Sequence, residues 1–316
     1  PVTLVSGLVS VIIPVFNRPE LVRSAVESAL AQTYPLVEVI VVDDGSTDET
    51  PQVLEALCQQ HPEKVRVLRT ANRGPGLARE AGRQAAKGEF VQYLDSDDLL
   101  CKTKLARQVD ALRRYPDSRF SLCGTAVVDA HGALLDSGLP TNRGSGTLFP
   151  ELLNSRWWQT STPLYRRQLL VEAGPWPTDR LFEDWQYEAQ IGVLGARYCY
   201  VPHVLTMFRR HEDHRLRDAV RERGTRVASF AVAVERVYRC AKRAGVSSSD
   251  PEMLRFVHQL LHTAGECSDT GQPATARRLL AAATKESLLS GRAGMIALCI
   301  KRGWRVLLSD RRGGGS

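Results

Sequence analysis

The chain has 316 residues, of which 43% are hydrophobic and 24% are charged, and its formal net charge is +7. This composition is typical of a folded globular protein and excludes a disordered, collagen-like or coiled-coil chain. At about 150 residues per domain, the length predicts two domains, or one domain with an appendage. Residues 1–215 carry 24 basic and 26 acidic side chains, whereas residues 216–316 carry 18 basic and 9 acidic ones. A slightly acidic body is therefore followed by a basic C-terminal region.

The cysteines and apolar stretches exclude several other classes. Seven cysteines are scattered along the chain without a CxxC pair. This predicts neither a zinc site nor a disulfide framework and favours reduced thiols in a cytoplasmic setting. The longest apolar stretch, 8–16, is interrupted by Ser10 and Pro14 and falls short of the roughly 20 residues that span a bilayer. We expect residues 1–8 to form an N-terminal arm and residues 311–316 a flexible tail or linker scar.

Short apolar strands alternate with helices over the first hundred residues. Strands are expected at Val9–Val15, Val37–Val42, Val65–Leu68 and Phe90–Leu94. Helices are expected at Pro19–Ala31, Thr50–Gln60 and about Pro75–Ala86. This alternation predicts an α/β fold with βαβ units around a mostly parallel sheet, which binds ligands beyond the carboxyl ends of its strands.

The rest of the chain is mixed up to about residue 215 and helical from there on. Before residue 215 we expect helices at Lys102–Arg114 and Phe182–Leu194, and strands at Phe120–Asp129, Arg197–Val201 and Val204–Arg209. After it we expect helices at Asp218–Arg243, Glu252–Glu266, Ala274–Ser287 and Ala293–Leu308. The expected domains are therefore residues 9–215, which are α/β, and residues 216–310, which are helical.

The most informative segment is Asp95-Ser96-Asp97-Asp98, which places three carboxylates directly after a buried strand. Two such charges about 4 Å apart repel by about 4 kcal/mol at an effective dielectric near 20, so a strand end tolerates them where a cation or water separates them. Carboxylate oxygens suit Mg²⁺ or Mn²⁺, which in turn bind diphosphates. The alternative is an acidic loop that caps the following helix.

Two further segments follow neighbouring strands. Asp43-Asp44-Gly45-Ser46 lies where an open α/β sheet holds a nucleotide, although a turn with a helix cap is the simpler explanation of this segment alone. Asn72–Arg79 is a Gly-rich turn that can present backbone N–H groups and Arg79 to phosphates. It is not a complete GxGxxG fingerprint, and the chain has no GxxxxGK[ST] motif, which argues against NAD-dehydrogenase and P-loop functions.

Together these segments resemble the inverting GT-A glycosyltransferases of family 2. The resemblance covers about residues 9–215 and rests on Val9–Asn17, Val42–Asp48, Asn72 with Gly76 and Ala78-Arg79, Asp95–Asp98, and Leu181–Trp185 with its Glu-Asp pair. It implies the GT-A fold, a Rossmann-like, mostly parallel sheet flanked by helices, here followed by a C-terminal helical region.

The resemblance also implies how a nucleotide-sugar donor would be held. The implied donor-binding residues are Pro14, Val15, Asn17, Asp44, Gly76, Arg79, Asp95, Ser96 and Asp97. Asp44 would hydrogen-bond the base, most often uracil, and Asp95 would contact ribose or sugar hydroxyls. Asp97, Asp98 and His211 would hold Mn²⁺ or Mg²⁺ against the diphosphate, with the direct ligand being either Asp97 or Asp98. A histidine in a polar loop is equally typical of a solvated surface residue.

For the chemical step, the resemblance implies that Asp184 is the general base of a single in-line displacement. The sequence alone also explains Glu183-Asp184 as the acidic first turn of a helix, and the two interpretations are compatible. Trp157, Trp158 and Glu183 are candidate acceptor contacts, because aromatic platforms suit sugar rings. Paired tryptophans are nevertheless more often packing elements.

The expected function is therefore transfer from a nucleotide-diphospho sugar, most often UDP-linked, to a hydroxyl of a glycan, lipid-linked or other acceptor, in the synthesis of a cell-surface polysaccharide or glycoconjugate. A sugar-phosphate nucleotidyltransferase is an alternative, but Val9–Arg18 lacks the Gly-rich loop of that class. A nucleic-acid-binding protein is a second, yet no binding module with interleaved aromatics is visible, so we expect no nucleic-acid partner. A catalytically silent member is a third, and the intact aspartates argue against it.

The basic C-terminal region ends in an amphipathic pattern. Its apolar positions share one helical face: Ile296, Ile300, Trp304, Leu307 and Leu308. Such a face packs against its own domain or in a homodimer, or lies peripherally on the anionic inner face of a membrane. Docking within the protein is the more common use of such a helix.

Overall fold

The computed structural model describes residues 4–129, 132–138, 144–210 and 222–292, together with positions 294, 297 and 301. The chain divides into two compact units. Unit 1 comprises Pro1–Thr147, Trp157–Arg180 and Ala196–Glu212, and unit 2 comprises Leu148–Arg156, Leu181–Gly195 and Asp213–Ser316. The domain boundary expected at residue 215 lies outside the described residues and stays a prediction. Two earlier segments, however, group with the C-terminal helices, which a linear division of the sequence does not anticipate.

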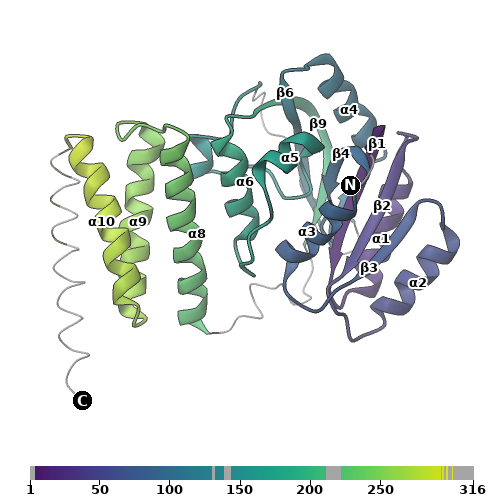
Figure 1. Ribbon diagram of the computed structural model, residues 1–316, viewed down its shortest axis with the longest axis horizontal. Helices are drawn as coiled ribbons and strands as arrows, with labels where there is room; N and C mark the ends of the chain where they lie inside the picture. The colour runs from purple at the N-terminus through teal and green to yellow at the C-terminus, as the bar shows by residue number, and fades with distance from the viewer. Residues whose placement is uncertain are drawn as a thin grey trace. The chain divides into compact units, whose positions relative to one another are not determined.

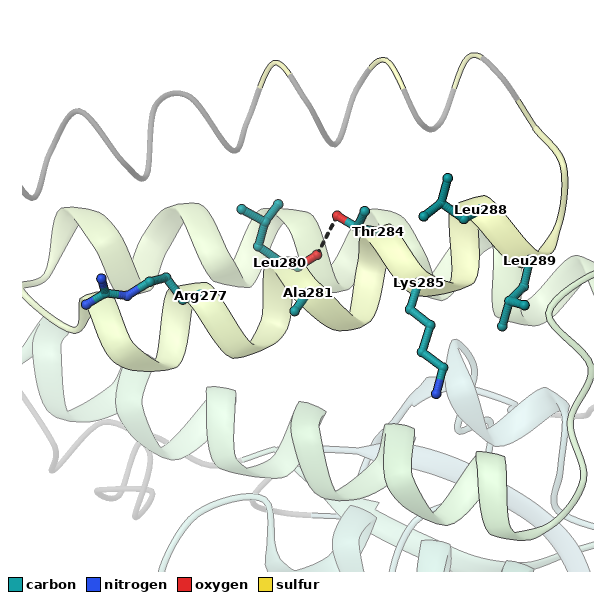
Figure 2. Close-up of a pocket in the computed structure, with 7 residues that line it drawn as sticks. All are labelled: Arg277, Leu280, Ala281, Thr284, Lys285, Leu288 and Leu289. Atoms are coloured by element: carbon teal, nitrogen blue, oxygen red, sulfur yellow. Dashed lines mark hydrogen bonds between the residues drawn. The ribbon is translucent and has the colours of Figure 1, made fainter.

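Unit 1 is built around a sheet whose strand order is β3-β2-β1-β4-β8-β6-β9-β5, with β7 paired to β6 (Figure 1). The strands are β1 Val5–Val15, β2 Val37–Asp43, β3 Val65–Arg69, β4 Gly88–Tyr93, β5 Leu99–Leu100, β6 Ser118–Val128, β7 Leu134–Asp136, β8 Leu164–Arg166 and β9 Arg197–Arg209. Strands β3, β2, β1 and β4 are parallel, and β8 runs antiparallel to both β4 and β6. The parallel part is the βαβ arrangement that the alternation of strands and helices predicts.

Helices cover both faces of this sheet. They are α1 Pro19–Leu30, α2 Thr50–Gln60, α3 Pro75–Ala85, α4 Lys104–Arg114 and α5 Arg167–Ala173. Val11 and Ile13 of β1 belong to one buried cluster with Val26 of α1. On the opposite face, a Cβ added to Gly82 of α3 would lie 2.3 Å from Ile12 Cγ2, so only glycine allows this close approach of helix and strand.

The expected strands and helices of residues 9–94 are confirmed to within a few residues. The strands expected at 197–201 and 204–209 are one continuous strand, β9. Strands β5 and β8 were not expected, because segments of two and three residues show no periodicity of their own. Their backbone groups are paired through distant partners, such as Gln92 with Leu164.

Unit 2 is helical, with α6 Glu183–Val193, α8 Arg223–Arg243, α9 Pro251–Asp269, α10 Pro273–Leu289 and the short 3₁₀ helix η1 Glu151–Leu153. Helices α8, α9 and α10 lie side by side (Figure 1). Val237 of α8 and Leu260 of α9 are fully buried, as is Ala283 of α10. The helix expected at 293–308 lies outside the described residues, apart from three single positions. None of the helices that the structure describes is long and apolar enough to cross a membrane.

Candidate donor and catalytic site

Three of the segments that the sequence singles out follow neighbouring parallel strands in unit 1. Asn17 follows β1, Asp44 follows β2, and Asp95 follows β4. Because β1 pairs in parallel with both β2 and β4, the carboxyl ends of the three strands meet at one edge of the sheet. This edge is where open α/β sheets bind their ligands.

Asn17 joins the end of β1 to the loop after β2. Its φ of 51° lies in the left-handed region, which asparagine tolerates better than most residues. Its backbone N–H donates to Ser46 Oγ at 3.0 Å, and its side-chain Oδ1 accepts the N–H of Thr47 at 2.8 Å. Asn17 is exposed, whereas Pro14 and Val15, the other expected pocket residues of this strand, are buried. Of the three expected pocket residues at the end of β1, Asn17 is therefore the accessible one.

Asp44 holds the loop that precedes α3. Its carboxylate accepts the backbone N–H of Arg73 at 3.0 Å and of Gly74 at 2.8 Å, and the hydroxyl of Thr70 at 3.2 Å. A negative charge at a helix N-terminus is favourable because it faces the positive end of the helix dipole. The sequence predicts that backbone N–H groups of this turn bind phosphates. In the structure the N–H groups of Arg73 and Gly74 donate to Asp44 instead. Gly76 is buried in the first turn of the helix.

Gly45 permits the contact between this loop and the end of β2. Its φ is +80°, and an added Cβ would lie 2.9 Å from the backbone nitrogen of Asn72 and 3.2 Å from the carbonyl oxygen of Thr70. Any other residue would clash with backbone atoms that cannot move without displacing the loop. Gly45 is therefore needed for the close packing of this loop as well as for the turn.

Arg79 of α3 forms an ion pair with Asp95. Its Nη2 donates to Asp95 Oδ1 at 2.6 Å, and the two side chains are 5% and 29% exposed. The guanidinium also lies 4.9 Å from the centroid of the Trp176 ring, in cation–π geometry. Trp176 is fixed in turn, because its indole N–H donates to the Tyr93 hydroxyl at 2.9 Å. Arg79 is therefore a rigid cation beside the first aspartate of the loop.

Asp97 is held by two arginines. Arg18 Nη1 donates to Asp97 Oδ2 at 2.6 Å, with side-chain exposures of 19% and 18%. Arg209 of β9 donates through Nε to the backbone carbonyl of Asp97 at 2.7 Å and through Nη2 to that of Leu21 at 3.1 Å. Burial lowers the pKa of Arg209. The sequence predicts no role for either arginine, although Arg18 directly follows Asn17 and Arg209 lies two residues before His211.

Asp98 differs from the two preceding aspartates. It is 1% exposed, and its carboxylate accepts the Ser161 hydroxyl at 2.7 Å and the Arg209 backbone N–H at 3.4 Å. Burial, followed by the charges of Asp97 and Asp95, raises the pKa of Asp98 well above its usual range. The buried carboxylate anchors the loop, while the carboxylates of Asp95 and Asp97 remain accessible. Ser96 is also buried.

The accessible carboxylates suit a divalent cation. Mg²⁺ is commonly bound by one or two carboxylates together with substrate phosphates and water, and Asp95 and Asp97 are the two that this loop exposes. Among the residues that the structure describes, no cluster of three or more His, Cys, Asp or Glu side chains is arranged to hold a metal. His211 lies outside the described residues. The loop therefore fits a cation that takes its remaining ligands from the donor and solvent.

The candidate base, Asp184, lies in unit 2 in the first turn of α6. Arg156 Nη1 donates to Asp184 Oδ2 at 2.7 Å, and the backbone N–H of Trp185 donates to Oδ1 at 2.8 Å. Arg156 also grips Glu188, one turn further along α6, through Nε at 2.7 Å and Nη2 at 3.0 Å. The sequence analysis missed Arg156 and Glu188, although the i, i+4 spacing of the two carboxylates places them on one helix face.

The backbone before Asp184 adopts an uncommon conformation. Phe182, the N-cap of α6, has φ 61° and ψ 20°, a left-handed conformation that costs a bulky residue about 1–3 kcal/mol. Its ring packs edge-on against Phe230 at a centroid distance of 5.0 Å, which holds it in place. Such strain is frequently found where a side chain must be aimed, and it directly precedes the expected Glu183-Asp184 pair.

The candidate acceptor residues are well packed. Trp157 and Trp158 contact each other edge-on at 5.2 Å, and Trp157 packs similarly against Tyr200 at 5.7 Å. Trp158 is 2% exposed and Glu183 is 7% exposed. The tryptophan pair is thus a packing element in this structure, and acceptor contact by these residues stays a prediction.

Known proteins are similar to this chain in the segments that form the candidate donor site. A family model described as glycosyl transferase family 2 matches residues 10–129, which contain the Asn17, Asp44 and Asp95–Asp98 positions. The chain contains a glycosyltransferase family 2 domain. An uncharacterized glycosyltransferase of Nostoc sp. is 42% identical over 179 residues, which cover 53% of each protein. One of Rickettsia prowazekii is 36% identical over 153 residues, covering 46% of this chain and 47% of the relative.

Solved structures share the fold of this family 2 domain. A solved structure of residues 1–349 of S. aureus TarS in complex with UDP-GlcNAc is 20% identical with a TM-score of 0.62, covering 97% of this chain and 92% of that fragment. The mannosyltransferase PcManGT of Pyrobaculum calidifontis, in complex with GDP-Man and Mn²⁺, is 21% identical with a TM-score of 0.52, covering 96% and 84%. The expected GT-A fold is therefore confirmed. The chain spans about half the length of the Nostoc relative and 22% of a Rickettsia bellii relative.

Proposed function

We propose that this chain transfers a sugar from a nucleotide-diphospho sugar, with a UDP-sugar as the preferred donor, to an acceptor hydroxyl with inversion at the anomeric carbon. The acceptor class is a glycan, lipid-linked or other hydroxyl compound in cell-surface polysaccharide or glycoconjugate synthesis. One observation supports this most strongly: Asn17, Asp44, Asp95 and Asp97 follow three adjacent parallel strands at one edge of the sheet, and two of the carboxylates stay accessible.

In this proposal the loop after β4 holds the donor diphosphate through a cation. Asp97 is the aspartate that contacts the cation, because its side chain is 18% exposed, whereas Asp98 is buried against Ser161. Asp95, at 29% exposure, is available to sugar or ribose hydroxyls. A bound Mn²⁺ or Mg²⁺ ion supplies neutralisation of the charge that develops on the leaving diphosphate.

The arginines around the loop complement this role. Arg18 and Arg79 each form a 2.6 Å ion pair with an aspartate of the loop, so they hold the carboxylates in fixed positions. Charge-assisted hydrogen bonds of this length are stronger than neutral ones and fix direction as well as distance. The arginines also place positive charge next to the position of an anionic donor.

Asp184 accepts the proton of the acceptor hydroxyl. That oxygen forms a bond to the anomeric carbon, the bond from this carbon to the diphosphate oxygen breaks, and the nucleoside diphosphate leaves with the bonding electrons. General base catalysis of this kind contributes about 10²–10⁴-fold in rate. The Arg156 guanidinium donates to one oxygen of Asp184 and also to Glu188. Because Glu188 neutralises part of the guanidinium charge, Arg156 lowers the basicity of Asp184 less than it would without Glu188.

Binding of UDP in the presence and absence of Mn²⁺, followed by isothermal titration calorimetry, tests the donor site. We expect tight binding only with the cation, and we expect Asp97→Asn to abolish the dependence on Mn²⁺. Asp110→Asn serves as the control, since Asp110 is an exposed carboxylate of α4 paired with Arg114. UDP binding that ignores both Mn²⁺ and Asp97 would contradict the proposed site.

A panel of UDP- and GDP-sugars then tests the reaction. We expect release of the nucleoside diphosphate from only some of these donors. The donors that react should also be the ones that fit the site and stabilise the folded chain. Formation of a nucleotide-sugar from a nucleoside triphosphate and a sugar 1-phosphate would instead support the nucleotidyltransferase alternative.

A further inference from the structure

Lys104, in the first turn of α4, is one of the largest fully buried side chains that the structure describes in unit 1. Lysine is almost never fully buried unless its charge is compensated. Its ammonium donates to the side-chain oxygen of Gln92, to Gln108 Oε1 at 2.5 Å and to the carbonyl oxygen of Thr162 at 3.1 Å. All three acceptors are neutral, so this is not an ordinary buried ion pair.

The charge state of Lys104 is defined by its surroundings. Burial lowers the pKa of Lys104 to about 8, with the neighbouring Cys123 and Cys101 acting in the opposite direction. Burial also raises the pKa of both cysteine thiols, which keeps them neutral at pH 7. The lysine therefore still carries three N–H donors at neutral pH, one for each acceptor.

The acceptors of Lys104 lead directly to one short segment, residues 159–162. Gln92 donates to the Ser161 carbonyl at 2.8 Å, and Gln108 donates to the Thr162 carbonyl at 3.2 Å. Lys104 occupies the side-chain oxygens of both glutamines, so their amide nitrogens face backbone carbonyls instead. Gln92 also donates to the Tyr93 carbonyl, and Gln108 also donates to the Ser121 carbonyl at 3.0 Å. The ammonium and the two amides together hold the carbonyls of Ser161 and Thr162.

Ser161 in turn holds the acidic loop. Its hydroxyl donates to Asp98 Oδ2 at 2.7 Å and accepts the backbone N–H of Asp95 at 3.1 Å. Asp98 N–H closes the loop onto the Asp95 carbonyl at 3.0 Å. The accessible Asp97 lies between these two anchored positions.

We propose that Lys104 is a positioning residue for the donor site: through Gln92, Gln108 and Ser161 it fixes the Asp95–Asp98 loop in the geometry that binds cation and diphosphate. The inference rests on the proposed function and assigns a task to a charge that the chemical step does not use. Burying a charge is unfavourable. Here the buried charge fixes the backbone at Ser161, and Ser161 holds a loop that lies more than 60 residues earlier in the chain.

Lys104→Met tests this proposal, because it keeps an unbranched side chain only one atom shorter than lysine and removes all three donors. We expect it to weaken Mn²⁺-dependent UDP binding by about 10-fold to 100-fold, the loss typical of groups that orient metal ligands. Ser10→Ala is the control: Ser10 is equally buried, but its hydroxyl bonds Glu38 and Gly88 N–H and has no link to the loop. UDP affinity of this control should stay within about twofold of the wild type, whatever its loss of stability.

A double-mutant cycle separates positioning from general destabilisation. If Lys104 acts through Ser161, the losses in UDP affinity of Lys104→Met and Ser161→Ala combine to less than the product of the two. Multiplicative losses would contradict the path through Ser161. If Lys104→Met does not fold, Lys104→Gln, which retains an amide donor, takes its place in the same cycle.

Hydrogen exchange provides a readout that does not depend on any donor or metal. We expect the amide of Asp95, which is bonded to Ser161, to exchange at least tenfold faster in Lys104→Met and at an unchanged rate in Ser10→Ala. Unchanged exchange at Asp95 in the folded lysine variant would overturn the inference even if UDP binds. Failure of the wild type to bind any nucleoside diphosphate, with faster exchange in the variant, would instead overturn the proposed function alone.

Discussion

Arg18 Nη1 donates to Asp97 Oδ2 at 2.6 Å and so joins the start of α1 to the acidic loop after β4. The two residues are 79 positions apart in sequence, and the pair is only partly exposed. The arginine therefore holds the aspartate in place and at the same time competes with any cation for it. These two effects have opposite consequences, which makes the pair a useful test.

Removing Arg18 should strengthen the binding of Mn²⁺ alone. A unit positive charge about 4 Å from a dication repels it by about 2–8 kcal/mol, depending on the effective dielectric, so Arg18→Gln should raise Mn²⁺ affinity by about tenfold or more. A Mn²⁺ titration followed by electron paramagnetic resonance, without nucleotide, measures this. Arg23 is a more exposed arginine of α1, so Arg23→Gln should leave the affinity for Mn²⁺ unchanged. Weaker Mn²⁺ binding in Arg18→Gln would show that positioning outweighs repulsion.

Asp184→Asn should lower kcat by about 10²–10⁴-fold, because the acceptor hydroxyl then loses its proton acceptor. UDP affinity should remain within about threefold of the wild type, since Asp184 is not among the proposed donor contacts. Asp269→Asn, an exposed carboxylate at the end of α9, is the control. Full turnover by Asp184→Asn would exclude it as the base.

Glu188→Gln should lower kcat without changing the affinity for the donor. Arg156 binds Glu188 through two nitrogens and Asp184 through one, so loss of the Glu188 charge leaves more of the guanidinium charge uncompensated beside Asp184. A nearby cation favours the ionised form, so the acid limb of the kcat profile should move to lower pH and the base should be weaker. A shift of one pKa unit corresponds to about tenfold in basicity. An acid limb that moves upward would contradict this role of Arg156.

The helical unit offers an independent test of stability. Glu286 of α10 is fully buried and accepts hydrogen bonds from the Tyr238 hydroxyl at 2.7 Å and from Lys242 Nζ at 3.1 Å. Glu286→Gln should reduce the free energy of unfolding by about 1–3 kcal/mol, whereas Glu235→Gln, which removes a more exposed pair with Arg278, should cost less than about 1 kcal/mol. Chemical denaturation of the two variants measures the difference. Equal losses would mean that the buried network adds nothing.

The same network predicts a pH dependence. Burial raises the pKa of Glu286, but hydrogen bonds from Ser248, Tyr238 and Lys242 together outweigh burial and leave this pKa lowered in the folded chain. A carboxyl whose pKa is lower in the folded than in the unfolded state contributes stability above its unfolded value, near 4.5, and loses it as the pH falls through the folded value. The wild type should therefore lose its stability advantage over Glu286→Gln below about pH 4.5. An advantage that persists to pH 2 would contradict this assignment.

The parallel half of the sheet could be predicted from the sequence because its signal is local. Each β-branched run, such as the one ending at Val15, is buried on both faces and needs no distant partner to be recognised. The role of Asp98 could not be predicted in this way. Three aspartates in one loop are equivalent in sequence, and only distant partners distinguish the buried one: the Ser161 hydroxyl, 63 residues away, and the Arg209 backbone N–H.

The same limit applies to the candidate base. The Glu-Asp pair was identified from its motif, but Arg156, 28 residues earlier in an irregular segment, has no periodicity or motif that announces its contact with Asp184. Lys104 shows the converse. A lysine in an amphipathic helix is normally assigned to the solvent face, and only the structure reveals that it is fully buried.

The stereochemistry of a single turnover tests the central claim most directly. An α-linked UDP-sugar accepted by the wild type is followed by ¹H NMR at the anomeric proton, with water or a hydroxyl compound as acceptor. Single displacement with Asp184 as the base predicts that the first product formed has the β configuration. A first product that retains the α configuration would contradict the account.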